Sequence, residues 1–415
     1  MISFCLQHGS SNKTFDKHLI YNVLFFISRI TKIMNNNYFI LAVLIGSTSL
    51  SHAEYQIGDS GAVAISIDAS VISTDNVSRD STEDSDVITS VLPTLQYKND
   101  AGAASIEAHV GQEFITYNDL SENDSEDLKS NVKITFPDEL DGENFSLVIE
   151  GGYNEYTSAL SARGGEGRVV STEVVDLSLS TSYYITDDIS LRAAVEHLDK
   201  ESQTTGFSDL TTLTVPVAFY YEIDESLSAG VGYRSRSSKV GSQVTSAKAD
   251  SDDEVFFVGI ENQVSDIWGY ELEVGVQERN FDANSLADQD GLFASLLVNW
   301  QISDMTELVG ELSNEFGTTL ANQSSETGSV GVQLNHTFDE RLSASLGLSY
   351  NEMEYTQANG ARDDERFSSF LTVDYKLMDG RWTLRGSVNH DDNDSSVAPA
   401  NYKALRGGLS SIFVF

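Results

Sequence analysis

The chain has 415 residues and a formal net charge of −39, from 25 Lys and Arg against 64 Asp and Glu. So acidic a chain repels nucleic acid and anionic lipid, and no nucleic-acid partner is expected. A single cysteine, Cys5, excludes a disulfide framework, and no apolar run reaches the roughly 18 residues that a membrane-spanning helix needs.

Residues 1–53 are predicted to be an export segment. An apolar stretch of signal-peptide length, Tyr38–Ile45, follows Met34, and small residues at Ser51 and Ala53 suit cleavage after Ala53. Residues 1–33 upstream are either a wrongly assigned start or an extended N-terminal region, so the signal peptide proper is 34–53. The mature chain, 54–415, would lose four basic residues and one acidic residue, reach a charge of −42 and contain no cysteine.

From residue 54 onward, apolar and polar side chains alternate as in β-strands, and helical periodicity is absent. About eighteen such segments can be distinguished, each long enough to cross a bilayer, where roughly 9–11 tilted residues suffice. The clearest segments are 61–72, 173–185, 267–277, 328–338, 365–377 and 380–390. Pro216 conflicts with a regular central strand and predicts a bulge or a shifted strand boundary.

Short turns alternate with longer polar connections along the whole mature region. Eight short turns and nine longer loops join eighteen strands and place both ends of the sheet on the short-turn side. This layout predicts an all-β fold, a single transmembrane antiparallel β-barrel with short periplasmic turns and longer extracellular loops. A soluble sandwich array or propeller remains the structural alternative.

Aromatic residues gather near the short turns, where a barrel carries a girdle at the lipid–water interface. Packing in a soluble core is the alternative explanation. The set is Tyr97, Phe136, Tyr183, Tyr184, Tyr220, Tyr221, Trp268, Tyr270, Trp300, Phe338, Tyr375 and Trp382.

The last segment, Tyr402–Phe415, alternates and ends on an aromatic residue, with Phe413 on the same face as Leu409. It resembles the terminal strand of bacterial outer-membrane barrels. With Trp300–Thr306, Leu342–Tyr350 and Phe367–Tyr375, it makes the mature region similar to the putative β-barrel porin class. The resemblance implies a Gram-negative outer-membrane location, contact with lipid and lipopolysaccharide, and an assembly signal at Phe413 and Phe415 that the barrel assembly machinery reads. It implies no catalytic residues, cofactor or metal.

Three acidic stretches were considered as sites of chemistry. Asn389–Asp394 contains a histidine beside carboxylates, and Asp250–Glu254 and Asn123–Asp127 are similar carboxylate clusters. A hydrolase barrel or a divalent-cation site could use such residues, but none has the spacing of a calcium loop, and solvated loops explain them equally. We expect no enzymatic activity.

Charged residues on the polar faces of the strands are the better functional candidates, because rings of charge determine ion preference in pores. The candidate pore-lining residues are Arg192, Glu196, Arg234, Arg236, Glu271, Glu273, Glu307, Glu311, Arg385 and Arg406. They suggest a porin-like channel for passive diffusion of small hydrophilic solutes or ions, with a preference for cations. The alternative is a non-conducting structural or surface-interaction barrel, in some cases associated with polysaccharide export.

Overall fold

The protein is described by a computed structural model, which covers residues 55–57, 60–100, 104–136, 145–159, 168–241, 247–265, 267–356 and 361–415. The export segment predicted for residues 1–53 lies outside these residues. Among the described residues, no helix is long and apolar enough to cross a membrane.

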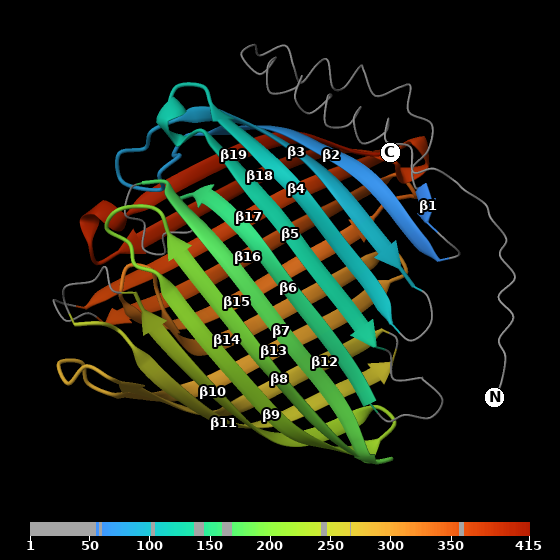
Figure 1. Cartoon of the computed structure of the whole chain (residues 1–415), viewed down its shortest axis with the longest axis vertical. Helices are drawn as coiled ribbons and strands as arrows, with labels where there is room; N and C mark the ends of the chain where they lie inside the picture. The colour runs from blue at the N-terminus through green and yellow to red at the C-terminus, as the bar shows by residue number, and fades with distance from the viewer. Residues whose placement is uncertain are drawn as a thin grey trace, which may run out of the picture. The chain divides into compact units, whose positions relative to one another are not determined.

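The described part of the chain forms one closed antiparallel barrel of eighteen strands, β2 to β19, in which every strand pairs with its sequence neighbours (Figure 1). Closure comes from the pairing of β19 with β2, from Arg406 opposite Thr74 to Val414 opposite Ser66. The short β1 (Tyr55–Ile57) pairs only with β2. The predicted fold class and strand number are therefore confirmed.

The strands have 12 to 17 residues, more than the roughly 9–11 that cross a bilayer. Their bounds are β2 Gly61–Thr74, β3 Asp86–Asn99, β4 Ser105–Tyr117, β5 Ser125–Phe136, β6 Phe145–Ser158, β7 Val170–Thr186, β8 Ile189–Ser202, β9 Leu210–Asp224, β10 Leu227–Val240, β11 Ser251–Ser265, β12 Trp268–Phe281, β13 Gln289–Ser303, β14 Thr306–Thr318, β15 Ser324–Thr337, β16 Leu342–Thr356, β17 Arg362–Leu377, β18 Trp382–Ser395 and β19 Tyr402–Val414.

Alternation along each strand separates an apolar outer face from a polar inner face. On β12, Val274 and Val276 are exposed on the outside, whereas Gln277 and Arg279 on the other face are buried. Because successive side chains of a strand point to opposite sides, this pattern assigns the whole strand. The outer face presents the broad apolar band that lipid requires.

The C-terminal residue closes the barrel seam. The Phe415 backbone N–H donates to the Ile65 carbonyl at 2.8 Å, and Val414 N–H donates to the Arg381 carbonyl at 2.9 Å. The Phe413 and Phe415 rings meet edge to face, with their centroids 4.7 Å apart. The terminal aromatic residues thus pack at the short-turn end.

Two details differ from the predictions. Pro216 lies inside β9 without a bulge, since the register of β9 with β8 and with β10 is continuous across it. The ladder to β8 only skips the pairs between Ala193–Val217 and Glu196–Thr214, because proline has no N–H to donate. Tyr220 and Tyr184 are not girdle residues. Tyr220 is buried on the inner face, whereas its neighbour Tyr221 is exposed outside, and Tyr184 lies on the inner face of β7 because Tyr183 and Ile185 on either side of it are exposed outside.

Candidate functional site on the inner face of the barrel

Side-chain bonds between strands that are not neighbours identify the inner face. Arg192 on β8 binds Glu261 on β11, with Nη2 2.8 Å from Oε2, and Arg234 on β10 lies 3.2 Å from Glu315 on β14. Two or three strands lie between the partners of each contact, so the side chains must meet across the concave inner surface of the barrel. All ten candidate residues lie on this inner face. Each is on the same side of its strand as one of these paired residues, or as a residue that stands opposite one of them in the ladder.

Each of the five candidate arginines has a carboxylate partner. Besides Arg192 and Arg234, Arg236 binds Asp253 at 2.8 Å, Arg385 binds Asp374 at 2.7 Å and Arg406 binds Asp391 at 3.2 Å. The sequence analysis found the arginines but predicted none of these pairings, although Asp253 and Asp391 lie in two of its acidic stretches. Their positive charge is therefore largely compensated within the wall.

The five candidate glutamates behave differently: within the described part of the chain, none of them is in an ion pair. Glu273 accepts a hydrogen bond from the Tyr220 hydroxyl at 3.4 Å, and Glu307 accepts one from Asn335 at 3.2 Å. Glu311 lies over Gly331, where its Oε1 would be 2.7 Å from an added Cβ. The structure therefore leaves Glu196, Glu271, Glu273, Glu307 and Glu311 without an ion-pair partner among the described residues.

A buried charge cluster lies towards the long-loop end of the same face. Asp253 on β11 stands opposite Arg236 on β10 and Arg279 on β12, and it binds both. Arg279 is 0% exposed and Asp253 is 2% exposed. Arg279 was not among the candidates, because it lies beyond residues 267–277, the segment that the sequence predicted for this strand.

Both arginines of this cluster also hold the end of the β14–β15 hairpin, residues 315–325, hereafter the inward hairpin. Arg236 donates to the Phe316 carbonyl, and Arg279 donates to the Gly317 carbonyl and to Ser324 Oγ, each at 2.6 Å. Gln277 Oε1 accepts the Phe316 N–H at 3.1 Å. The hairpin end therefore separates from β13 and lies against the inner face of β10 to β12, while its β15 side stays paired with β16 as far as Ser324.

The tip of the inward hairpin docks on loops further around the barrel. The Leu320 carbonyl accepts the Ser208 N–H at 2.8 Å, and Asn322 bonds to the backbone of Ala247 and Ala249. Leu320 is buried in an apolar cluster with Val170, Phe207, Leu210, Val240 and Ala249. These residues belong to β7, β9, β10 and their loops, so the hairpin bridges part of the long-loop mouth.

An aromatic layer lies on the same side of the lumen. Tyr220, Phe257 and Phe293 form a buried cluster with Ala218 and Val255. The guanidinium groups of Arg192 and Arg234 stack on Tyr220 and Phe293, 4.3 and 4.7 Å from the ring centroids. The wall from β8 to β14 is thus thickened by side chains, whereas small residues such as Gly331, Gly347 and Ser368 line a cavity from β14 to β19 that Glu311 and Arg406 also line.

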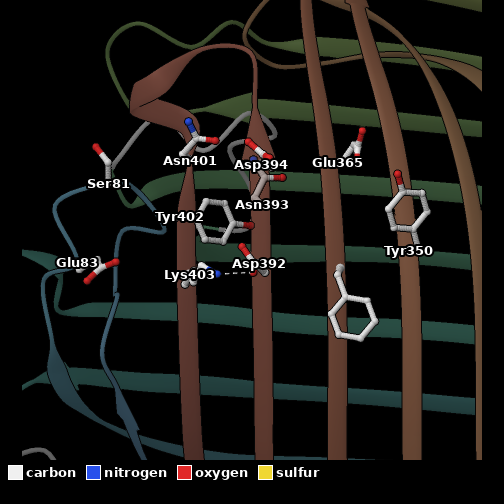
Figure 2. A pocket seen from close by; sticks show the side chains of 11 residues that line it. Ser81, Glu83, Tyr350, Glu365, Asp392, Asn393, Asp394, Asn401, Tyr402 and Lys403 are labelled. Atoms are coloured by element: carbon white, nitrogen blue, oxygen red, sulfur yellow. Dashed lines mark hydrogen bonds and ion pairs between the residues drawn. The ribbon is translucent and has the colours of Figure 1, made fainter.

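The acidic stretch 391–394 is divided between the two faces. Asp391 points inward and accepts bonds from Arg79, Ser368 and Arg406. Asp392 and Asp394 line a pocket on the other face, where Lys403 Nζ is 2.8 Å from Asp392 Oδ2 (Figure 2). Asp250–Glu254 is divided in the same way around inward Asp253.

In the described part of the chain, the acidic stretches do not assemble into the hydrolase site or the divalent-cation site considered from the sequence. His390 and Asp391 are consecutive strand residues and point to opposite faces. Among the described residues, no group of three or more His, Cys, Asp or Glu could hold a metal ion.

The comparison with protein families agrees with this architecture. The model of the family described as Putative beta-barrel porin 2 matches residues 229–412, less than half of the chain. This chain is a Gram-negative outer-membrane β-barrel. The match includes most of β10, all of β11 to β18 and most of β19. This part of the barrel contains the buried charge cluster, the inward hairpin and eight of the ten candidate residues.

Several solved structures are similar to this outer-membrane barrel. Pseudomonas aeruginosa OccK2 (OpdF) is 12% identical, with a TM-score of 0.48 over 86% of this chain and 97% of that chain. Acinetobacter baumannii OccAB4 is 11% identical, with a TM-score of 0.49 over 86% and 99%. The outer membrane protein OpdK from Pseudomonas aeruginosa is 11% identical, with a TM-score of 0.46 over 85% and 99%. No curated protein matches the chain.

Proposed function

We propose that this barrel is a porin-like channel through which small hydrophilic solutes and ions diffuse passively, with a preference for cations. An eighteen-strand sheet is wide enough to enclose an aqueous lumen. The ten candidate residues would line that lumen, and none is assigned a catalytic role. The protein would act without a cofactor or metal and without enzymatic activity.

One observation carries the cation preference. The candidate arginines are ion-paired, and the candidate glutamates in the described wall are not. An arginine held against a carboxylate attracts a passing anion weakly, because its field is cancelled at short range. An unpaired carboxylate in a low-dielectric wall attracts cations over about a Debye length, near 10 Å at 0.1 M salt.

The inward hairpin favours a narrow channel, and it is also the observation that favours the second candidate function, a non-conducting barrel. A segment that bridges the mouth reduces the open cross-section between β7 and β14. If the remaining passage were too small for hydrated ions, the barrel would be a closed structural or surface-interaction protein. The small residues that line the cavity between β14 and β19 favour the open alternative.

The same proposal includes the protein's partners. The apolar outer band would contact outer-membrane lipid, and the barrel end that carries the longer loops would contact lipopolysaccharide. Phe413 and Phe415, packed at the short-turn end, would present the signal that the barrel assembly machinery reads. Residues 34–53 would direct export and be removed after Ala53.

Single-channel recording in planar lipid bilayers tests the proposal. Purified, heat-modifiable barrel should produce discrete conductance steps in KCl, and the same preparation unfolded by heating should produce none. A folded barrel that inserts into the bilayer without conductance would favour the closed alternative.

A further inference from the structure

The ladder between β13 and β14 stops short of the strand ends. Its last pair is Ala294 with Asn314, although β13 continues to pair with β12 as far as Gln289. β14 likewise continues to pair with β15 as far as Thr318. Residues 289–293 of β13 thus have a strand partner on one side only.

Side-chain amides replace the missing ladder at this edge. The Leu292 carbonyl accepts hydrogen bonds from Asn314 Nδ2 at 2.6 Å and from Gln277 Nε2 at 2.9 Å. Gln289 bonds to Ser324 and Thr356. An incompletely paired strand edge is costly at a membrane, and amide side chains satisfy it without fixing β14 in place.

The side-chain pattern of β14 is compatible with a position of its last residues in the barrel wall as well as with their observed position in the lumen. Leu308 and Leu312 lie on the outer face, and alternation would place Phe316 there too. In the structure Phe316 is instead 2% exposed, packed by the inward hairpin against Gly291 and Arg279, and Leu292 on β13 is left 68% exposed. Continuing the register from Ala294–Asn314 by two residues would bring Leu292 opposite Phe316.

The charge cluster does not depend on the hairpin. Arg236, Asp253 and Arg279 lie opposite one another on three adjacent strands and bind each other within the wall. Release of the hairpin would cost the arginines their bonds to the Phe316 and Gly317 carbonyls and to Ser324, and would move Glu315, but both ion pairs to Asp253 would stay intact. Two hairpin positions are therefore compatible with the same wall.

We propose that the inward hairpin is a gate with two positions. In one it lies across the lumen, as observed; in the other it extends the β13–β14 ladder, places Phe316 beside Leu292 on the outer face and widens the passage. Ladder pairs and an apolar outer contact would replace the carbonyl bonds and the Leu320 contacts. This inference rests on the proposed channel function for its effect on conductance, but not for the movement itself.

Disulfide trapping in a full-length Cys5→Ser background tests the gate, because the chain then has no other cysteine. Leu292→Cys/Phe316→Cys can cross-link only in the wall position, since the two side chains now occupy opposite sides of the wall. Ser208→Cys/Leu320→Cys can cross-link only in the observed position, where the backbones of these residues are hydrogen-bonded. Each single variant is the matched control, and heat-modifiable migration verifies folding.

We expect both pairs to cross-link under a mild oxidant. Oxidised Leu292→Cys/Phe316→Cys should conduct about twofold more, or better, than its reduced form, and oxidised Ser208→Cys/Leu320→Cys should lose the larger openings. A Leu292→Cys/Phe316→Cys pair that stays reduced while the other pair cross-links fully would overturn the gate. So would cross-linking of Ser208→Cys/Leu320→Cys that leaves the current unchanged. Cross-linking of both pairs without any conductance would instead refute the channel and leave the movement established.

Discussion

Arg279 Nε lies 2.6 Å from Asp253 Oδ1 at a point of the barrel wall where both side chains are almost completely buried. Arg236 binds the second oxygen of the same carboxylate. Removal of one partner from a buried ion pair leaves the other charge buried without compensation, so we expect substitutions in this cluster to destabilise the barrel strongly.

Asp253→Asn should lower the free energy of unfolding by about 3–5 kcal/mol, because two buried arginines lose their counter-charge. Asp374→Asn is the matched control, since it removes the partner of Arg385, whose side chain is 44% exposed, and should cost at most about 1 kcal/mol. Urea unfolding of the barrels in lipid vesicles compares them. Equal losses for the two variants would show that the cluster does not stabilise the wall.

Leu272 and Glu273 provide a test of the register. Leu272 shares the outer face with Val274 and Val276, whereas Glu273 faces inward towards Tyr220. Leu272→Arg should cost roughly 2–4 kcal/mol near the bilayer midplane, and Glu273→Arg should be tolerated. Folded yield after refolding into vesicles measures both; greater damage from Glu273→Arg would reverse the inside and outside of β12.

Loss of Phe415 should reduce the amount of folded barrel in the outer membrane. Its N–H bond to Ile65 and its ring contact with Phe413 complete the seam between β19 and β2. Ser396→Ala in the last long loop is the comparison, because an exposed loop tolerates change. Heat-modifiable band intensity in membrane fractions should fall for the deletion only; similar intensities would argue against an assembly role.

The turn between β15 and β16 predicts a pH effect. Backbone N–H groups of Arg341 and Leu342 donate to the Asp339 carboxylate and lower its pKa. A carboxyl with a lowered folded-state pKa stabilises the fold above its unfolded pKa, about 3.9, and loses that contribution as pH falls through the folded value. The urea midpoint of wild type should exceed that of Asp339→Ala at neutral pH, and the difference should vanish in acid. A difference that persists in acid would exclude the charge as its cause.

Strand number, topology and the face of most residues could be predicted from the sequence, because alternation and turn rhythm are local signals. The inward orientation of Arg192 and Glu273 follows from their immediate neighbours. Tyr220 was misassigned because it lies beside Tyr221 near a short turn, where one aromatic residue faces lipid and the next stacks under Arg192.

The ion-pair partners could not be predicted. Arg192 meets Glu261 across β9 and β10, and Arg234 meets Glu315 across three strands. Such contacts depend on strand tilt and barrel curvature, which leave no trace in residue spacing. The inward hairpin was hidden for a different reason: alternation continues through Phe316, so the sequence of β14 is equally that of a regular wall strand.

The zero-current potential across a planar bilayer is the most direct test of the central claim. With KCl at about 0.01 M on one side and about 0.1 M on the other, wall charges act over Debye lengths of about 30 and 10 Å. If the unpaired glutamates control the pore, the zero-current potential should have the sign that K⁺ selectivity gives. The size of this potential should be smaller in the Glu271→Gln/Glu307→Gln variant. A potential of the Cl⁻-selective sign would contradict the account and show that the paired arginines still control the pore.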